Sequence, residues 1–133
     1  MVTYQELLKQ AFKATRLSYA PYSKFRVGAA LLTEDDEVVT GCNVENASYG
    51  LSNCAERTAV FKAVSMGKLR FKAIAVVSNK QNPVYPCGAC RQVLREFNKD
   101  ITVILSDRRG RPIKTKLSKL LPNSFGPEDL RRT

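Results

Sequence analysis

The sequence contains no histidine. Without an imidazole, a Ser-His or Cys-His nucleophile pair is impossible, and any zinc site must use cysteine or carboxylate ligands. No apolar run approaches the roughly 20 residues that span a bilayer, and the first residues do not resemble a signal peptide. We therefore expect a protein of the cytoplasm with no membrane contact, where its four cysteines bind a metal or act in catalysis and are not disulfide-linked.

The length of 133 residues fits one domain, spanning 1–133, that buries about two-thirds of the surface exposed by its unfolded chain. The unusual global number is the net charge of +10, because strongly basic small proteins often bind nucleic acid. Much of this charge lies in the segment 108–119. No aromatic stacking platform interleaves these charges, so we interpret the segment as a solvated hairpin, with a patch that contacts RNA or DNA backbone as the alternative.

Helical and strand periodicities alternate along the chain. A capping box at Thr3 and Glu6 opens a helix over about 4–18. The later patterns predict strands at 27–32 and 38–43, a helix at 54–66 capped by Asn53 and closed by Gly67, a strand at 73–77, a helix at 87–98, strands at 101–105 and 113–116, and a short helix at 118–121. This order predicts an α/β fold with a mixed five-stranded sheet and helices on its faces.

Three cysteines stand at the starts of two of these helices. Cys87 and Cys90 are three residues apart, which puts both side chains on one helix face, and a helix N-terminus favours the thiolate. Cys54 supplies a third sulfur from another helix start, and right-handed crossovers allow the two starts to meet at one edge of the sheet. Three protein ligands leave a fourth position for water, which is the arrangement of a catalytic zinc site.

Glu56 follows Cys54 by two residues, in the same first helical turn, and therefore lies near any metal held there. A carboxylate beside a metal-activated water can act as its base. The alternative is a closed structural site, completed by Cys42, in a nucleic-acid-binding module. Cys42 lies on a predicted strand beside Gly41, as an ordinary core cysteine does, and a structural zinc has no use for an adjacent carboxylate. We favour the catalytic site, with one zinc ion per chain.

The cysteine motifs also resemble those of a known family. The stretches Cys54-Ala55-Glu56 and Pro86-Cys87-Gly88-Ala89-Cys90 resemble the zinc-dependent deaminase signature in its three-cysteine form. Further likeness lies in Phe25–Leu32, Gly41–Tyr49, Cys54–Ala59 and Leu120–Phe125. Over most of residues 4–130 the chain resembles the small homotetrameric type of cytidine deaminase. The resemblance implies a three-layer sandwich, with helices on both faces of the five-stranded sheet.

The activity that this resemblance implies is the hydrolysis of cytidine and deoxycytidine to uridine and deoxyuridine plus ammonia, in pyrimidine salvage. Zinc-bound hydroxide would attack C4 of the ring while Glu56 shuttles protons. A polynucleotide cytosine or a cytosine-containing antibiotic such as blasticidin is the alternative substrate. The resemblance also implies a homotetramer with shared active sites.

The positions that match the family's motifs imply further roles. By this resemblance Phe25 packs against the substrate's base, the Ala55 backbone reads the pyrimidine edge, and Asn43 and Glu45 hold the ribose 3′-hydroxyl. Arg57 is implied to donate hydrogen bonds to the ligand sulfurs. Phe125 is implied to reach the base bound in a neighbouring subunit. The substrate contacts at Asn43 and Glu45 favour the nucleoside over the alternative substrates. Tyr49 and Gln92 receive no role, because packing or polar support explains either residue.

Overall fold

The structure is a computed structural model that describes residues 1–131. Its strands are β1 (Val27–Thr33), β2 (Val38–Cys42), β3 (Phe71–Ser78), β4 (Thr102–Ser106) and β5 (Pro112–Lys116). Its helices are α1 (Tyr4–Ala14), α2 (Ala55–Ser65), α3 (Gly88–Phe97), α4 (Leu117–Leu120) and α5 (Pro127–Leu130), with short 3₁₀ turns η1 (Thr15–Leu17) and η2 (Tyr49–Leu51). Most bounds agree with the sequence prediction to within two residues.

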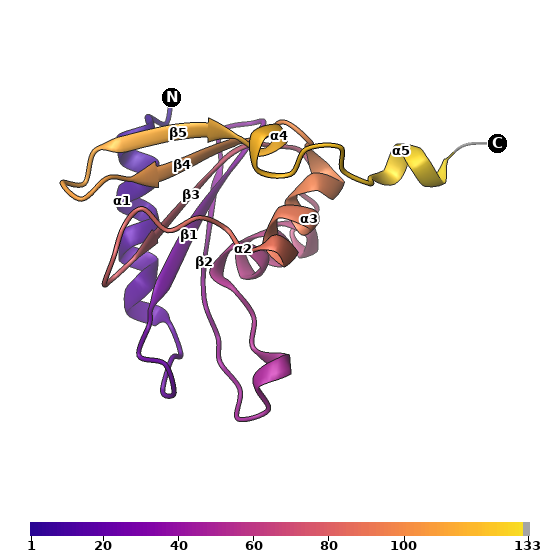
Figure 1. Ribbon diagram of the computed structural model, residues 1–133. Helices are drawn as coiled ribbons and strands as arrows, with labels where there is room; N and C mark the ends of the chain where they lie inside the picture. The colour runs from indigo at the N-terminus through magenta and orange to yellow at the C-terminus, as the bar shows by residue number, and fades with distance from the viewer. Residues whose placement is uncertain (132–133) are drawn as a thin grey trace.

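The strands form one mixed sheet in the order β2-β1-β3-β4-β5. The central pair β3 and β4 is parallel, and the other neighbouring pairs are antiparallel. A parallel pair needs a crossover connection, which α3 provides between β3 and β4 (Figure 1). The predicted mixed five-stranded sheet is therefore confirmed.

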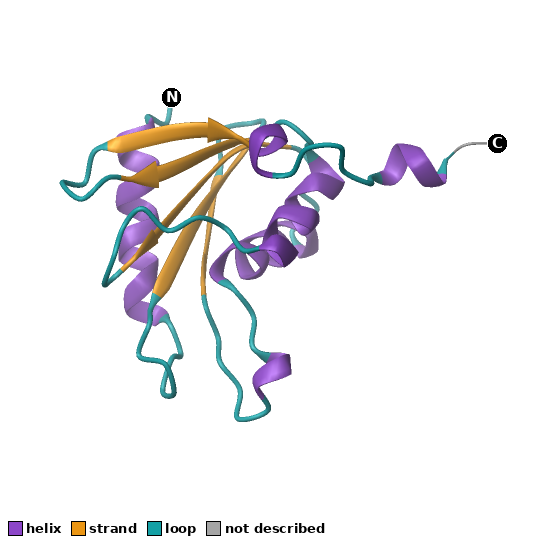
Figure 2. Ribbon diagram, in the orientation of Figure 1, coloured by secondary structure: helices purple, strands orange, loops and turns teal. Residues whose placement is uncertain are grey.

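Apolar side chains alternate along the central strands, so that each face of the sheet has its own core. One core joins α1 to one face through Leu7, Leu8, Ala11, Ala30, Leu32, Ala73, Ala75, Val77 and Ile104. The opposite core joins α2 and α3 to the other face through residues that include Ala29, Leu31, Ala59, Val60, Ile74, Val76, Leu94 and Val103. Figure 2 shows the resulting three layers, with the sheet between α1 and the pair α2 and α3.

The backbone of α2 lies directly against β2 at Gly41. A Cβ atom at this position would lie within 2.6 Å of the Ala59 nitrogen and the Ala55 carbonyl oxygen. Only glycine allows this close approach, because the obstructing atoms belong to the helix backbone and cannot rotate away. The contact fixes the start of α2 relative to the sheet.

The prediction that Asn53 caps α2 is wrong. The N-cap residue is Cys54, in extended conformation and without a side-chain cap hydrogen bond. Asn53 instead forms a β-bridge with Val44, and its side-chain amide donates to the Thr58 hydroxyl at 3.2 Å. At the other end Gly67 adopts φ +82°, a left-handed conformation suited to glycine, and the helix ends there as predicted.

The sequence patterns did not predict α5. After α4 the chain leaves the body of the molecule, and α5 lies at the end of the projecting tail (Figure 1). Among residues 1–131, no helix combines the length and the apolar composition required to cross a membrane.

Candidate active site

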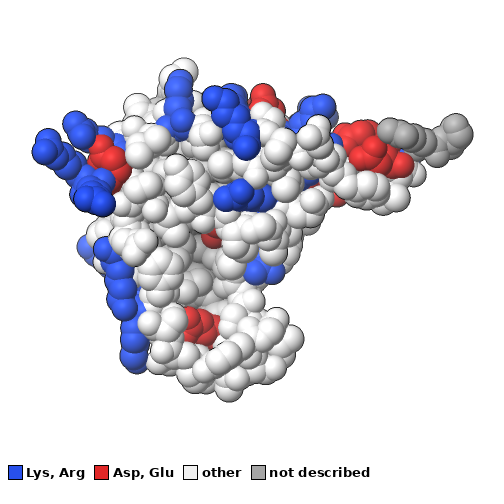
Figure 3. Space-filling model, in the orientation of Figure 1, with Lys and Arg blue, Asp and Glu red and all other residues white. Residues whose placement is uncertain are grey.

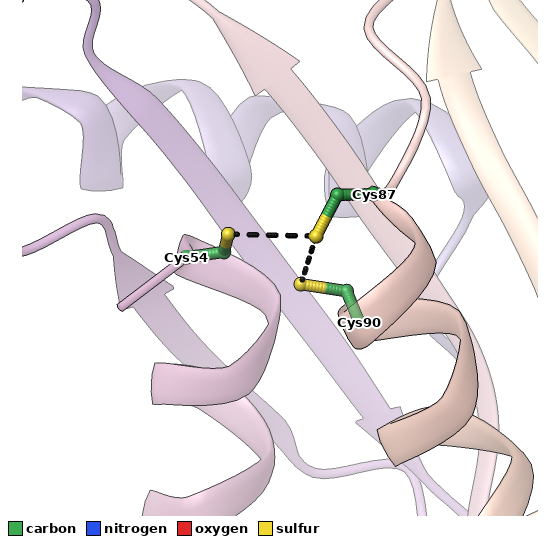
Figure 4. A group of neighbouring side chains, drawn as sticks. All are labelled: Cys54, Cys87 and Cys90. Carbon is green, nitrogen blue, oxygen red and sulfur yellow. Dashed lines mark hydrogen bonds between the residues drawn. The ribbon is translucent and has the colours of Figure 1, made fainter. Parts of the chain in front are cut away.

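Two helix starts converge, an arrangement that the sequence allowed, and bring three sulfurs together. Cys54 is the N-cap of α2, Cys87 is the N-cap of α3, and Cys90 lies in the first turn of α3. The Sγ atoms of Cys54 and Cys87 are 3.7 Å apart, and those of Cys87 and Cys90 are 3.5 Å apart (Figure 4). All three sulfurs lie within 4.8 Å of one another.

This spacing fits a zinc ion. Zn–S bonds of about 2.3 Å in tetrahedral geometry place sulfurs about 3.8 Å apart, close to the separations found here. Within the described residues, no other three potential ligand atoms from His, Cys, Asp or Glu lie close enough together to share a metal ion. Cys42 lies on β2, half-buried and outside this group, and burial raises the pKa of its thiol. The Cys₃ cluster can hold one zinc ion and retains an open position.

The ionisation of the cluster depends on its mutual contacts. A hydrogen bond from Cys90, with a further contribution from Arg57, lowers the pKa of Cys54 to about 5. The same pairing with Cys54, together with burial, raises the pKa of Cys90. One thiolate therefore suppresses the ionisation of its neighbour, and a cation among the sulfurs is needed for all three to be charged.

Arg57 supplies positive charge beside these sulfurs. Its Nη2 donates to Cys54 Sγ at 3.3 Å, and this contact raises the pKa of the guanidinium. The Nε atom of Arg57 is buried and has no hydrogen-bond partner within residues 1–131. It is thus available as a further donor when the thiolates carry full charge.

Glu56 lies in the first turn of α2, and only 4% of its surface is exposed. Burial raises the pKa of its carboxyl to about 7, and the charge of Cys54 acts in the same direction. The backbone N–H of Glu56 itself and the charge of Arg57 oppose this increase. A carboxyl group in such surroundings can both accept and release a proton.

Glu56 and two of the cysteines line a pocket of about 300 Å³. Its lining residues are Phe25, Val27, Asn43, Glu45, Ser52, Asn53, Cys54, Ala55, Glu56, Val84, Tyr85 and Cys87. A larger hollow of about 560 Å³ lies beside α1, on the other face of the sheet, and no cysteine lines it. The chemically reactive groups therefore belong to the smaller pocket.

Asn43 uses both ends of its side-chain amide to fix the pocket wall. Its Oδ1 accepts from the Val27 N–H at 2.9 Å, and its Nδ2 donates to the Phe25 carbonyl at 2.8 Å. The position of Phe25 at the pocket is therefore set by Asn43, across 18 residues of sequence.

Glu45 is held in a similar way. Its carboxylate accepts from the Tyr22 N–H at 3.0 Å, the Ser23 N–H at 3.1 Å and the Ser23 hydroxyl. The Ser23 hydroxyl and these N–H groups lower the pKa of Glu45, so it remains a carboxylate at neutral pH. Figure 3 shows acidic atoms inside the hollow beside the loop that carries η2, whereas most Lys and Arg side chains lie outside it.

Phe125 does not line this pocket, unlike the other predicted substrate contacts. It lies on the projecting tail with 58% of its surface exposed, and its carbonyl accepts from Gln92 Nε2 at 2.9 Å.

The sequence patterns missed Val84 and Tyr85, which reach the pocket from the loop between β3 and α3. These two large side chains stand in an otherwise polar loop that leads directly to Cys87, and this placement could have marked them as pocket residues.

Comparison with known proteins gives a consistent result. Residues 1–106 match the sequence profile of the cytidine and deoxycytidylate deaminase zinc-binding region. The chain is 53% identical over 127 residues to the cytidine deaminase of Sporosarcina psychrophila, covering 95% of this chain and 93% of that protein. It is 52% identical over 127 residues to the cytidine deaminase of Halalkalibacterium halodurans, covering 95% and 96%. The crystal structure of cytidine deaminase from Burkholderia pseudomallei superimposes with a TM-score of 0.87 at 51% identity, covering 92% of this chain and 99% of that one.

Proposed function

Because this chain belongs to the cytidine and deoxycytidylate deaminase family, we propose that it hydrolyses cytidine and deoxycytidine to uridine and deoxyuridine plus ammonia. The observation that carries this proposal is the buried Glu56 carboxyl group, which shares a pocket wall with the converging cysteines. Residues 1–133 would act as one domain, and the reaction would serve pyrimidine salvage in the cytoplasm.

Cys54, Cys87 and Cys90 would hold the zinc ion, which when bound would lower the pKa of a coordinated water to about 7. Glu56 accepts one proton from the attacking water and delivers it to N3 of the ring. It then takes the second proton from the hydroxyl group on C4 and passes it to the amine, so that the bond between C4 and the amine nitrogen breaks as the carbonyl forms. One carboxyl group thus serves first as base and then as acid. Its burial keeps bulk water from competing for the proton.

Arg57 has a separate task in this proposal. Three thiolates outweigh a divalent cation by one negative charge, which would weaken the centre as a Lewis acid. By donating to Cys54 Sγ, Arg57 withdraws electron density from a ligand and offsets this excess.

The remaining pocket residues bind the nucleoside in this proposal. Phe25 packs against the pyrimidine, the Ala55 backbone at the start of α2 reads its edge, and Asn43 and Glu45 contact the ribose 3′-hydroxyl. Both polar side chains are already fixed by contacts to neighbouring loops, so little conformational freedom is lost when the sugar binds.

We further propose a homotetramer in which Phe125 of one subunit closes the pocket of another. The exposure of this ring and its absence from the lining of its own pocket support the idea. Several other large apolar side chains are exposed, among them Tyr49, Leu51, Phe61 and Met66. Exposed apolar groups of this kind favour association, and closed symmetry would complete every pocket in the same way.

The direct test adds cytidine to the purified protein and follows the loss of its near-ultraviolet absorbance. We expect turnover that a chelator abolishes and added zinc restores. Blasticidin S and a cytosine-containing oligonucleotide serve as competing substrates across a salt series. Turnover of an uncharged nucleoside should depend weakly on salt concentration. For a single-stranded oligonucleotide, the logarithm of the binding constant falls against the logarithm of salt concentration with a slope of about −0.7 per neutralised phosphate. Faster turnover of either competitor than of cytidine would contradict the proposal.

A further inference from the structure

Side chains of α3 hold the end of α4 and the tail that follows it. Arg91 Nη1 donates to the Leu120 carbonyl at 2.8 Å, and Gln92 Nε2 donates to the Phe125 carbonyl at 2.9 Å. Arg95, one turn further along α3, contacts Ser124 and Glu128. The tail therefore follows α3 before it projects from the molecule, as Figure 1 shows.

Arg95 makes the most extensive of these contacts. Its Nε donates to the Ser124 hydroxyl at 2.6 Å, Nη1 approaches Glu128 Oε2 at 3.5 Å, and Nη2 forms an ion pair with Glu128 Oε1. The Arg95 side chain is only 7% exposed, whereas that of Glu128 is 56% exposed. A buried guanidinium needs a counter-charge and filled donor positions, and the tail supplies both.

Gly126 provides the space for this arrangement. A Cβ atom at this buried position would overlap the Arg95 guanidinium and the Glu128 carboxylate. The Gly126 N–H donates to Asp129 Oδ2 at 2.9 Å, which shapes the turn into α5. We name Arg95, Ser124, Gly126 and Glu128 the Arg95 clasp.

Phe125 lies between the points at which the clasp holds the tail. On one side of it, the Ser124 hydroxyl accepts a hydrogen bond from Arg95, and on the other side Gly126 lies against the Arg95 guanidinium. The carbonyl of Phe125 itself accepts from Gln92. The Phe125 ring nevertheless remains 58% exposed. The backbone at this position is fixed while the aromatic side chain is presented outward.

The helix that carries the clasp also carries two of the sulfurs. Cys87 caps α3 and Cys90 lies in its first turn, whereas Arg95 lies near its end. A helix of 10 residues is a rod about 15 Å long, so these groups keep a fixed separation. The position of Phe125 therefore depends on α3, the helix that also carries Cys87 and Cys90.

We propose that Arg95 is a positioning residue for the deamination. Through Ser124 and Glu128 it holds the tail in the conformation that presents Phe125 to a substrate pocket. This inference rests on the proposed role of Phe125 in a neighbouring pocket. It goes further by naming the residues that hold Phe125 in place, and it assigns them a kinetic effect as well as a structural one.

A double-mutant cycle on kcat/KM tests the proposal. Glu128→Gln removes the counter-charge but retains the size of the side chain, and we expect kcat/KM for cytidine to fall about 5- to 100-fold, because small displacements of a contacting group have effects of this order. In a Phe125→Ala background the same change should have almost no further effect, since the clasp acts through that ring. Ser124→Ala should show the same pattern with a smaller loss, and it carries the cycle if Glu128→Gln does not fold.

The matched control is Glu96→Gln, which removes an exposed carboxylate from α3 next to the clasp. It should leave kcat/KM, zinc content and thermal unfolding unchanged. A merely structural role for Arg95 predicts instead that Glu128→Gln lowers zinc content or melting temperature and that its kinetic loss multiplies with that of Phe125→Ala. Multiplicative losses would overturn the proposal.

A second readout reports directly on the tail. The chain contains no tryptophan, so Phe125→Trp introduces a single tryptophan at the clasp, which can be excited selectively over the five tyrosines. We expect its fluorescence anisotropy to fall when Glu128→Gln or Gly126→Ala is added, and to remain unchanged with Glu96→Gln. An unchanged anisotropy in the clasp variants would show that Arg95 does not hold the tail.

The outcomes separate this inference from the function on which it rests. Wild-type kinetics in Phe125→Ala would contradict the substrate role of Phe125, and the inference about Arg95 would fall with it. A slow Phe125→Ala enzyme combined with wild-type kinetics in both Glu128→Gln and Ser124→Ala would overturn the Arg95 inference alone.

Discussion

At the residue scale, the start of α2 carries both Cys54, one of the three clustered sulfurs, and Glu56, the carboxyl group to which we assign the proton transfer. As N-cap, Cys54 has an extended backbone conformation, and its sulfur is directed to the start of α3. Glu56 lies two residues later and is almost fully buried in the pocket wall. The spacing keeps the carboxyl group beside the sulfurs and leaves it outside the metal-binding group.

Replacing Glu56 with Gln should abolish catalysis without removing the metal. An amide of nearly the same size preserves the packing but cannot accept the proton of the water. We expect turnover of cytidine to fall at least about 10²-fold, with about one zinc per chain retained. Steady-state kinetics and zinc analysis measure both quantities, and Glu96→Gln is the matched control. Near-normal turnover in a zinc-replete Glu56→Gln protein would rule out the proton-transfer role.

Replacing Cys42 with Ala should leave the metal centre intact. Cys42 lies on β2, outside the cluster of the other three cysteines, so its loss removes no ligand. We expect about one zinc per chain and most of the activity, whereas Cys90→Ala should lose both. Zinc analysis of the two variants decides the question, because loss of metal from Cys42→Ala would indicate a four-cysteine site.

At the element scale, the site depends on how closely α2 approaches the sheet. Gly41 allows the backbone of α2 to lie against β2, and this contact sets the position of the helix start that carries Cys54 and Glu56. The start of α3 is set independently, by the crossover between the parallel strands β3 and β4. The two helix starts can meet because both helices cover the same face of the sheet.

Substituting Gly41 with Ala should therefore disturb both stability and activity. The added methyl group would collide with the α2 backbone, and such overpacking costs about 1–3 kcal/mol. We expect a lower free energy of unfolding in a urea titration and a lower kcat/KM, since the helix start moves. Gly50→Ala is the control, because a Cβ at that position meets no atom within 4 Å among the described residues. Equal stability and kinetics in the two variants would contradict this account.

At the scale of the whole molecule, charge and active site are separated. Lys and Arg side chains gather along the edge formed by β5 and at the tip of the β4–β5 hairpin, away from the hollow of the pocket (Figure 3). Lys114 lies 6.0 Å from the ring centre of Tyr4, and Arg111 pairs with Asp107. Among the described residues, no Lys or Arg side chain lines the pocket.

Mixed oligomers should reveal whether active sites are shared between subunits. Glu56→Ala and Phe125→Ala proteins should each be weak alone, because each lacks one part of every pocket. Mixed assemblies contain pockets in which one chain supplies Glu56 and another supplies Phe125, so their activity should exceed the sum of the separate proteins. The assay is cytidine turnover after subunit exchange has been verified by mass spectrometry.

The control mixes Glu56→Ala with Glu56→Gln, in which no pocket can regain its carboxylate and no gain is expected. If verified mixed oligomers of Glu56→Ala and Phe125→Ala also show no gain, Phe125 acts within its own chain or has no role in the reaction.

Local patterns carried much of the sequence prediction. Strand alternation and helix periodicity placed the central strands and the long helices correctly, because the core on each face of the sheet requires these repeats. The pairing of Cys87 with Cys90 follows from spacing along one helix. The cap of α2 was mispredicted because Asn53 is bound to Val44, a contact across the loop that no local pattern shows. We did not predict α5, although Pro127 at its first position and the acidic residues Glu128 and Asp129 are typical of a helix start; its turn is shaped around a side chain of α3.

By itself, the sequence of this protein determined which residues can bind zinc and which carboxyl group stands beside them, since ligand type and helix position are local properties. Tertiary structure decided that Cys54 lies 3.7 Å from Cys87, that Glu56 is buried, and that Phe125 is held outside its own pocket. The physical reason is that periodicity specifies which face of an element is apolar, whereas the distance between two elements depends on all the side chains packed between them.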